Sequence, residues 1–257
     1  MPNQNELDIS EEKNKKIAKI LAVCFALFLF LDFLIVSLLF GLSDWIATLI
    51  FAMLLIVPAY LSNAGMVLVG GGKPIDRGKV LKDGKRLFGA HKTWKGLVLG
   101  PLYIGIPISI GIYLLFLALW KYIVLIIEAA SAAGAYFLYD NIVVYQYYFI
   151  GGLFPTGFVV MLIRIIFCAY GAALGDLLGS FLKRRFNIGS GNPFWIVDQL
   201  DFVSLSILFT AIPGLFLPKS FLIPDLNIII FLLILTPAVS IIANTVAYAI
   251  GLKDVPW

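Results

Sequence analysis

The sequence is poor in charge, in cysteine and in histidine, and each shortage excludes a class of protein. Aspartate, glutamate, lysine and arginine make up 13% of the 257 residues, about half their share in an ordinary soluble domain. Cys24 and Cys168 are the only cysteines and lie far apart inside apolar runs, which excludes a disulfide framework and a cysteine zinc site. His91 is the only histidine, so no cluster of zinc ligands can form around it.

Hydrophobic residues take the place of the missing charge. They account for 61% of the chain, give a mean hydropathy of +0.99, and gather in runs of the length, about 20 residues, that crosses a bilayer. The sequence therefore predicts an all-α integral membrane protein with about six transmembrane helices, in a single domain over residues 17–257 behind a polar tail over residues 1–16. The predicted spans are Ile17–Phe40, Trp45–Leu61, Leu97–Trp120, Phe158–Leu178, Phe202–Phe216 and Leu226–Ile250.

The basic residues indicate which side of the membrane each loop faces. They gather before the first span, in a loop over about 71–95, in a loop over about 183–201 and after the sixth span. Because lysine and arginine collect on the cytoplasmic side, we expect a multi-pass protein of the cell membrane whose two polar loops form a cytoplasmic active site. The net charge of +4 then reflects topology and does not indicate a nucleic-acid partner.

One stretch does not fit this pattern simply. Residues 121–157 are apolar and tyrosine-rich, with Glu128 among them. A full crossing here would put the two basic loops on opposite faces. We therefore expect an outer-face or re-entrant insert whose tyrosines lie at the headgroup level.

The end of the fourth predicted span carries small and polar residues in a regular pattern. Asp176, Ser180 and the pair Lys183–Arg184 form one helical stripe. An aspartate at such a position needs a partner, either Lys183 or Arg184 as an internal ion pair, or a bound cation. The neighbouring stripe is made of small residues that favour close helix packing, and these are Gly171, Gly175 and Gly179.

Two further acids precede the fifth predicted span. Asp198 and Asp201 are three residues apart, so they share one helical turn and their charges repel each other unless a cation is bound. Together with Asp176 they form a set of oxygen ligands of the kind that suits Mg²⁺, which binds one or two carboxylates together with substrate phosphates and water. The alternative is a solvated helix start, where acids are favoured by the helix dipole.

The first polar loop, residues 70–96, is rich in glycine and basic residues. Such a loop could simply hold anionic lipid headgroups. Lys92, Thr93 and Lys95, however, lie at the start of the third span, where free backbone N–H groups and added charge favour phosphate. This arrangement indicates a triphosphate site, although the Walker pattern GxxxxGK[ST] is absent. We expect His91 to be non-catalytic, since a phosphate monoester is already largely dianionic at pH 7.

These motifs resemble a known enzyme family. Gly175-Asp176, Ser180-x-x-Lys183-Arg184 and Asp198-x-x-Asp201 resemble the signature of the phosphatidate cytidylyltransferases, or CDP-diacylglycerol synthases. The closer resemblance is to the archaeal branch, the CDP-archaeol synthases, through the blocks at residues 58–76, 83–96, 174–185, 200–202 and 252–257. Relative to that family the first span and the 121–157 stretch look additional.

The resemblance implies a Mg²⁺-dependent cytidylyltransferase. Its substrates would be CTP and an isoprenoid ether-lipid phosphate, 2,3-di-O-geranylgeranyl-sn-glycerol 1-phosphate, and its products CDP-archaeol and pyrophosphate. It implies Asp176, Asp198 and Lys92 as catalytic residues, and Asp176 and Asp198, helped by Asp201, as metal ligands. The remaining candidates for binding nucleotide or phosphate are Thr93, Lys95, Arg86, Ser180, Lys183, Arg184, Asp83, Asp76, Asn63 and Lys73.

Other functions remain open from the residues alone. A CDP-diacylglycerol synthase acting on phosphatidate would share the same motifs. A membrane transporter or lipid-binding protein would carry charges deep within several spans, whereas most charges here lie in two loops. Asp32, Glu128 and Arg164 are the exceptions within apolar stretches, and we expect a structural pairing for Arg164. A CDP-alcohol phosphotransferase would need a D-G-x-x-A-R pattern, which Asp83-Gly84-Lys85-Arg86 does not provide.

Overall fold

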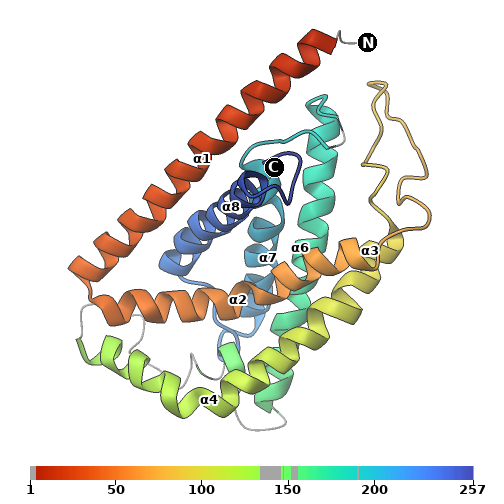
Figure 1. The fold of residues 1–257 in the computed structure, drawn as a ribbon. Coiled ribbons are helices and arrows are strands. Elements are labelled where there is room, and N and C mark those ends of the chain that lie inside the picture. Colours follow the sequence, from red (N-terminus) through yellow and green to blue (C-terminus); the bar gives the residue numbers. More distant parts are fainter. Residues whose placement is uncertain (1–3, 134–145, 147, 152–155, 190, 257) are drawn as a thin grey trace.

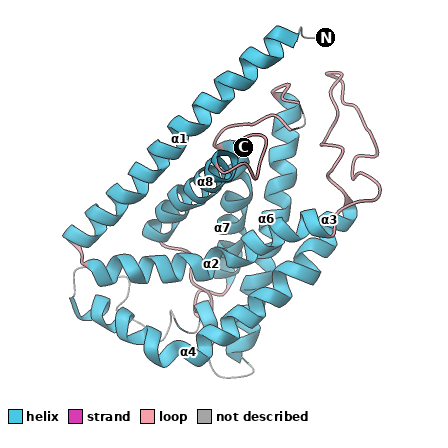
Figure 2. Cartoon of the chain, in the orientation of Figure 1, coloured by secondary structure: helices cyan, strands magenta, loops and turns pink. Residues whose placement is uncertain are grey.

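The computed structural model describes residues 4–133, 146, 148–151, 156–189 and 191–256, with side chains from residue 10 onward. In this part of the chain the backbone is helical apart from connecting loops, which carry two isolated β-bridges. The helices are α1 (Gln4–Leu39), α2 (Leu42–Leu68), α3 (Trp94–Gly100), the π-helical turn η1 (Pro101–Gly105), α4 (Ile106–Ala133), α6 (Thr156–Arg185), α7 (Val197–Phe216) and α8 (Leu226–Ala249). Figures 1 and 2 show them as a bundle of crossing helices.

Six helical segments of the described chain are long and apolar enough to cross a membrane, which confirms the predicted number and order of the spans. The protein is thus a multi-pass membrane protein. The segments are Ser10–Leu39, Leu42–Leu68, Trp94–Ala132, Thr156–Arg185, Val197–Phe216 and Leu226–Ala249.

Two predicted boundaries were wrong. The polar tail, expected to be separate from the first span and to end at residue 16, is the beginning of α1 from Gln4 onward. The third span, expected to end at Trp120, continues as α4 to Ala133, because no proline or glycine interrupts residues 121–133. In Figure 1 the ribbon of α4 bends in its second half. Most of the rest of the expected insert lies outside the described residues.

The third span crosses α2 at very short range. A methyl group added at Gly100 would lie 2.6 Å from the backbone nitrogen of Met66, and one added at Gly65 would lie 2.7 Å from the carbonyl oxygen of Gly100. Only glycine permits this approach. The crossing holds the end of α2 against α3, so the loop between them, residues 69–93, is closed at its base.

The α6–α7 pair depends on the glycine stripe in the same way. A methyl group at Gly171 would lie 2.8 Å from the carbonyl oxygen of Leu205, and one at Gly175 would lie 2.4 Å from that of Asp201. The predicted packing role of these glycines is confirmed. Their contacts fix how α7 is placed along α6.

Arg164 lies in the middle of the bundle and is fully buried. Its guanidinium donates hydrogen bonds to the carbonyl oxygens of Tyr148 (3.1 Å), Leu54 (3.0 Å) and Phe149 (2.7 Å), and it lies 4.8 Å from the centre of the Tyr113 ring. The expected structural role is therefore confirmed, with backbone carbonyls as the partners of this cation.

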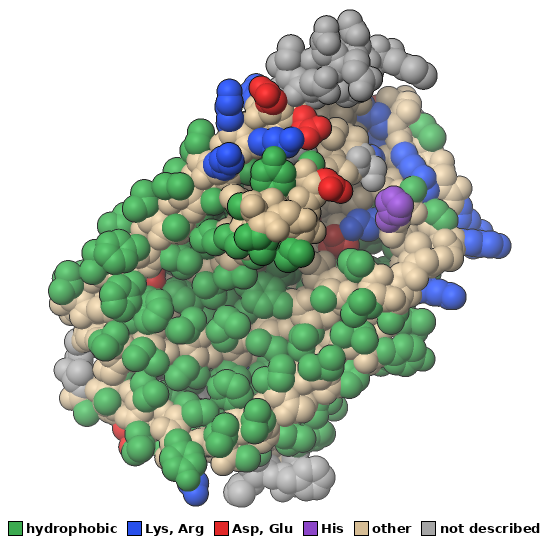
Figure 3. Space-filling view, viewed as in Figure 1, with side chains coloured by type: hydrophobic (Ala, Val, Ile, Leu, Met, Phe, Trp, Pro, Cys, Tyr) green, Lys and Arg blue, Asp and Glu red, His purple; other side chains and the backbone are tan. Residues whose placement is uncertain are grey.

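Charge gathers at one end of the molecule. Figure 3 shows most of the blue and red side chains, and the purple one, at the end where the two polar loops lie, above a broad hydrophobic surface. The beginning of α1 and the chain end after α8 are at this polar end as well (Figure 1). The helix order thus places both polar loops on one side of the bundle.

Candidate functional site

Two adjacent cavities open at the polar end. The first, of about 260 Å³, is the polar cavity, and its lining residues are Gly89, His91, Lys92, Asp176, Ser180, Lys183, Arg184, Gly191, Asp198 and Asp201. The second, of about 430 Å³, is the mixed cavity, and its lining residues are Asn63, Met66, Val67, Gly70, Gly71, Gly72, Ile75, Ala90, His91, Lys92, Thr93, Gly96, Leu97, Ala173, Asp176 and Leu177. The two polar loops and the ends of α2, α3, α6 and α7 therefore meet here.

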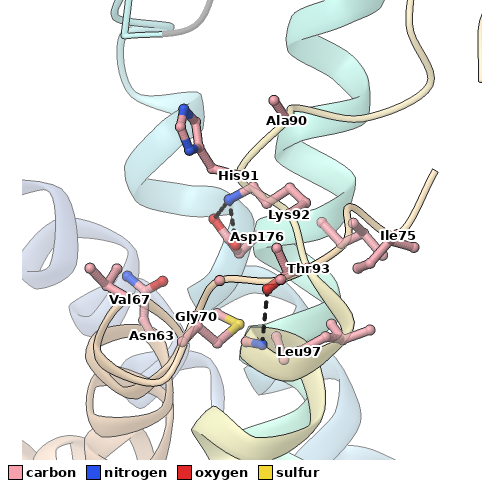
Figure 4. Close-up of a pocket in the computed structure, with 16 residues that line it drawn as sticks. Asn63, Val67, Gly70, Ile75, Ala90, His91, Lys92, Thr93, Leu97 and Asp176 are labelled. Carbon is pink, nitrogen blue, oxygen red and sulfur yellow. Dashed lines mark hydrogen bonds and ion pairs between the residues drawn. The ribbon is translucent and has the colours of Figure 1, made fainter. Parts of the chain in front are cut away.

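Lys92 and Asp176, with His91 beside them, form the wall that both cavities share. The Lys92 Nζ donates to the two carboxylate oxygens of Asp176 at 2.6 and 2.5 Å, as Figure 4 shows. Each side chain is about a quarter exposed. The expected alternatives for Asp176, an ion pair with Lys183 or Arg184, were wrong, because a lysine 84 residues away takes that place.

Asp198 is held from two directions at the start of α7. Its Oδ2 atom accepts hydrogen bonds from Lys183 Nζ at 2.8 Å and from the Phe194 backbone N–H at 3.0 Å. The backbone N–H of Asp198 donates in turn to the Phe194 carbonyl oxygen at 3.0 Å. The turn before α7 therefore fixes this carboxylate at the rim of the polar cavity.

Asp201 owes its position to the absence of a side chain at Gly179. A methyl group there would lie on top of the Asp201 carboxylate, within 2.7 Å of its Cγ atom. The carboxylate accepts a hydrogen bond from the Phe202 backbone N–H at 2.6 Å. The glycine stripe thus does more than bring α6 and α7 together, because it also leaves room for the third acid of the cavity.

The three acids predicted as metal ligands line the same cavity, and the site has the oxygen chemistry that Mg²⁺ prefers. Within the described residues, no group of three or more histidine, cysteine, aspartate or glutamate side chains is arranged to hold a metal ion. Two of the acids instead bind lysines, Asp176 to Lys92 and Asp198 to Lys183. The donor set therefore fits magnesium in kind, with lysine nitrogens occupying positions beside its oxygens.

The cations of the polar cavity are suited to an anionic ligand. Lys92, Lys183 and Arg184 line it, so three cations stand against three carboxylates. Within the described chain the buried Arg184 Nε has no hydrogen-bond partner. A donor of this kind in a cavity wall favours a ligand rich in acceptor oxygens.

Ser180 and Thr93 mainly support the backbone. The Ser180 hydroxyl accepts a hydrogen bond from the Gly89 N–H at 2.9 Å, which ties the first loop to α6. Thr93 caps α3, its hydroxyl accepting from the Gly96 N–H at 3.2 Å. The predicted helix start at this position is confirmed. Lys95 is exposed beside Gly72 and does not line either cavity.

Asp76 is the anchor of the first loop. Its side chain is fully buried and accepts hydrogen bonds from Arg86 at 2.8 and 2.7 Å and from the N–H groups of Gly78 and Phe88 at 2.9 Å. These bonds, with those from Arg86 the strongest, hold the pKa of Asp76 well below its usual range. Asp76 therefore shapes the loop, and its buried carboxylate does not face a ligand.

Three other predicted residues lie outside both cavities. Asp83 pairs with Arg185 at 2.5 Å, and a hydrogen bond from the Lys85 N–H is the main cause of the lowered pKa of Asp83. Lys73 and Arg86 line a separate cavity on the outside of the first loop. These three residues, expected to bind nucleotide or phosphate, thus lie outside the cavities that Asp176 lines.

Some residues at the site carried no readable signal in the sequence. The apolar lining of the mixed cavity, such as Met66, Leu97 and Leu177, belongs to spans that are apolar throughout. Asn63 was anticipated and does line this cavity. His91 lines both cavities. The sequence shows that it is the only histidine but does not show where it lies.

A family model described as "CarS-like: CDP-archaeol synthase" matches residues 42–138 and 142–257. The match begins at the start of α2, which agrees with the expectation that the first span is additional. It includes almost all of residues 121–157, so the expectation that this stretch is additional was wrong.

Curated relatives show the same likeness over nearly their whole length. A CDP-archaeol synthase of Thermococcus onnurineus is 37% identical over 82% of this chain and 99% of its own. Those of Halobacterium salinarum and Archaeoglobus fulgidus are 34% and 35% identical over 83% and 79% of this chain, and over 99% and 94% of their own. A solved structure described as "Structural insight into an intramembrane enzyme for archaeal membrane lipids biosynthesis" is 26% identical over 78% of this chain and 93% of that one, with a TM-score of 0.42.

Proposed function

This chain belongs to the CDP-archaeol synthase family, and from that membership we propose how its two cavities divide the work of a cytidylyltransferase. The substrates are CTP and 2,3-di-O-geranylgeranyl-sn-glycerol 1-phosphate, the phosphate of an isoprenoid ether lipid. The products are the CDP-activated lipid and pyrophosphate. The observation that carries the proposal is the wall formed by Lys92 and Asp176, which faces both cavities.

The polar cavity suits the triphosphate of CTP. It offers Lys92, Lys183 and Arg184 as cations. Gly89 and Gly191 also line it, and because they have no side chain a ligand can come close to the backbone there. Charge-assisted hydrogen bonds from such groups are the strong ones for phosphate oxygens.

The mixed cavity suits the lipid phosphate. Met66, Val67 and Leu97 give it apolar walls, while Asn63 and Lys92 supply polar contacts. It lies where α2 and α3, both parts of apolar spans, reach the polar end. An amphipathic ligand can thus place its phosphate beside Lys92 and leave its isoprenoid chains among the helices.

Asp176 and Asp198, with Asp201 beside them, are the residues that would hold Mg²⁺ here. A bound magnesium ion neutralises triphosphate charge and makes the α-phosphorus more electrophilic. Lys92 and Lys183, which bind Asp176 and Asp198, carry the charge that would neutralise phosphate oxygens of the substrates. The lysine pairs hold the two carboxylates in place before the ligands bind.

The reaction needs positioning more than acid–base chemistry. An oxygen of the lipid phosphate forms a bond to the α-phosphorus of CTP, and the bond from that phosphorus to the oxygen of the β-phosphate breaks. Pyrophosphate leaves with the electron pair. The second pKa of a phosphate monoester is about 6, so the attacking lipid phosphate is already largely dianionic at pH 7. It needs no base to remove a proton, and His91 therefore has no such role.

The decisive experiment measures pyrophosphate release from CTP by the purified full-length protein. We expect release only when the ether-lipid phosphate and Mg²⁺ are both added. Release with phosphatidate at equal kcat/KM would assign the alternative substrate, and transport or binding without pyrophosphate would refute the proposed chemistry.

Two variants test the division between the cavities. Arg184→Gln, in the polar cavity, is expected to raise KM for CTP, and Val67→Trp, in the mixed cavity, to raise KM for the lipid phosphate. Each variant should leave the KM of the other substrate within about twofold, since the two side chains line different cavities. The reverse pattern would exchange the assignments.

A further inference from the structure

The first helix lies outside the region matched by the family, which begins at residue 42, yet it reaches the candidate site. We propose that α1 positions Asp198 in this protein, through a hydrogen bond between Asn14 and Trp195. Asn14 is thus a positioning residue for the magnesium–CTP site. The inference rests on the proposed function, because it concerns a carboxylate assigned there to the metal.

Helix α1 is placed for this role by its packing on α8. Ala18 is fully buried, and the Lys15 ammonium lies 5.6 Å from the centre of the Tyr248 ring at the end of α8. Further along, Phe25 packs against Ala238 and Ile241. The first turns of α1 are therefore held at the polar end of the bundle, where Figure 1 also shows them.

The contact with the site is specific. Trp195 donates a hydrogen bond from Nε1 to Asn14 Oδ1 at 3.3 Å, across 181 residues of sequence. Trp195 lies in the turn that precedes α7, between Phe194, whose N–H binds the Asp198 carboxylate, and Ile196. A tether on the tryptophan ring therefore acts on the segment that orients Asp198.

The turn before α7 has a strained backbone, which a contact from outside the turn can stabilise. Ile196 adopts φ 67°, in the left-handed region that a β-branched residue rarely adopts. The turn around it is closed by hydrogen bonds from Val197 to the Trp195 carbonyl at 2.8 Å and from Leu200 to the Ile196 carbonyl at 2.9 Å. Strained conformations persist only where their surroundings hold them, and the bond from α1 is one such support.

The test compares Asn14→Ala with a control, Ser10→Ala, which alters an exposed residue of the same helix. For Asn14→Ala we expect KM for CTP and the Mg²⁺ concentration for half-maximal rate to rise about fivefold, the loss typical of one neutral hydrogen bond. The kcat at saturation and KM for the lipid phosphate should stay unchanged. Asn14→Asp keeps an oxygen acceptor and should restore the original values.

A binding measurement separates this inference from the proposed function. Calorimetric titration with CTP and Mg²⁺, without lipid, should show the same fivefold weakening for Asn14→Ala and for Trp195→Phe. The double variant should be no weaker than either single one, because both remove the same bond. Equal affinity of Asn14→Ala and the original protein would overturn the role of α1, as would a lowered melting temperature with unchanged KM. Failure of the original protein to bind CTP would instead overturn the proposed function.

Discussion

Two ion pairs at the polar end join side chains from segments that are distant in the sequence. Lys92 meets Asp176 across 84 residues and Arg185 meets Asp83 across 102 residues. Each pair ties the first polar loop to α6. Single side chains here therefore have two tasks, since they hold the loops in place and also set the charge that a ligand meets.

Asp176 is the acid that lines both cavities, together with its partner Lys92. Asp176→Asn removes the charge but keeps the size, so Lys92 loses its charged partner and the proposed metal site loses a ligand. We expect kcat to fall at least about 100-fold, as for a lost metal ligand or electrostatic contact in other enzymes. Pyrophosphate release is the measurement, and Glu128→Gln, an exposed acid on α4, is the matched control. Full turnover by Asp176→Asn would remove the metal assignment.

Asp76 makes the first loop sensitive to acid. Its pKa is lowered in the folded protein by the Arg86 guanidinium, so the carboxylate stabilises the loop above its unfolded pKa of about 3.9. That stabilisation is lost as the pH falls from there toward the folded value. Hydrogen exchange over residues 74–93, corrected for the intrinsic rate, should show protection falling below about pH 4. In Asp76→Asn protection should be low at every pH, and a variant that retains the acid-dependent loss would exclude Asp76 as its cause.

Arg164 is expected to matter for stability and not for chemistry. Arg164→Met would leave three buried carbonyl oxygens short of their guanidinium donor, at a cost of about 3 kcal/mol. Thermal unfolding in detergent should show a clear drop in melting temperature. The kcat per folded molecule at low temperature should be unchanged, and a selective loss of kcat would place Arg164 in the reaction instead.

Sequence reasoning identified the residue types of the site better than their pairings. Asp176, Asp198, Asp201, Lys92 and Arg184 do line one cavity, because the chemistry of charge near a membrane leaves few alternatives. The partners of Asp176 and Asp198 could not be read, since a single sequence does not say which loops touch. Burial of Asp76 was hidden for the same reason.

At the level of helices, the α6–α7 contact is the most demanding. Gly175→Ala places a methyl group 2.4 Å from the Asp201 carbonyl oxygen, so α7 must move away and carry Asp198 and Asp201 with it. We expect loss of both activity and stability, the latter by about 1–3 kcal/mol.

Gly111 in α4 offers a matched control, because a methyl group there meets nothing within 4 Å. Gly111→Ala should leave activity intact and add up to about 1 kcal/mol of stability through helix propensity. Unfolding curves and pyrophosphate assays of the two variants decide the point. Equal behaviour of the two would show that α6 and α7 have more freedom than their spacing indicates.

The helices themselves were readable where hydropathy and sequence breaks coincide. Spans such as α8 begin at a capping aspartate, Asp225, whose side chain accepts from the Ile228 N–H at 3.0 Å. The continuation of the third span to Ala133 was missed because the placement of the basic loops argued against a further crossing in residues 121–157. The early start of α1 was missed because hydropathy falls there while helix propensity does not. Polar residues can continue a helix beyond the membrane, and hydropathy does not register that.

The whole molecule has a polar end and an opposite end, and the basic residues predict that the polar end faces the cytoplasm. Single cysteines introduced as Lys82→Cys and Asp254→Cys should react with a membrane-impermeant maleimide only after cells are opened. Ser220→Cys, in the loop between α7 and α8, should react in intact cells. Labelling of Lys82→Cys from outside would invert the topology and place the chemistry on the other face.

The fit of α7 against the small residues of α6 has a consequence for biogenesis. Sliding the two helices by one turn would bring the Asp201 carboxylate away from Gly179, the place where a missing side chain makes room for it. A molecule in which α6 and α7 are paired one turn out of place would thus have its acidic side chains in the wrong positions. Such a molecule would be inactive and not partially active. Errors in membrane insertion should therefore lower the number of active molecules and leave the turnover of each active molecule normal. The total activity of a preparation is then proportional to the number of correctly assembled molecules.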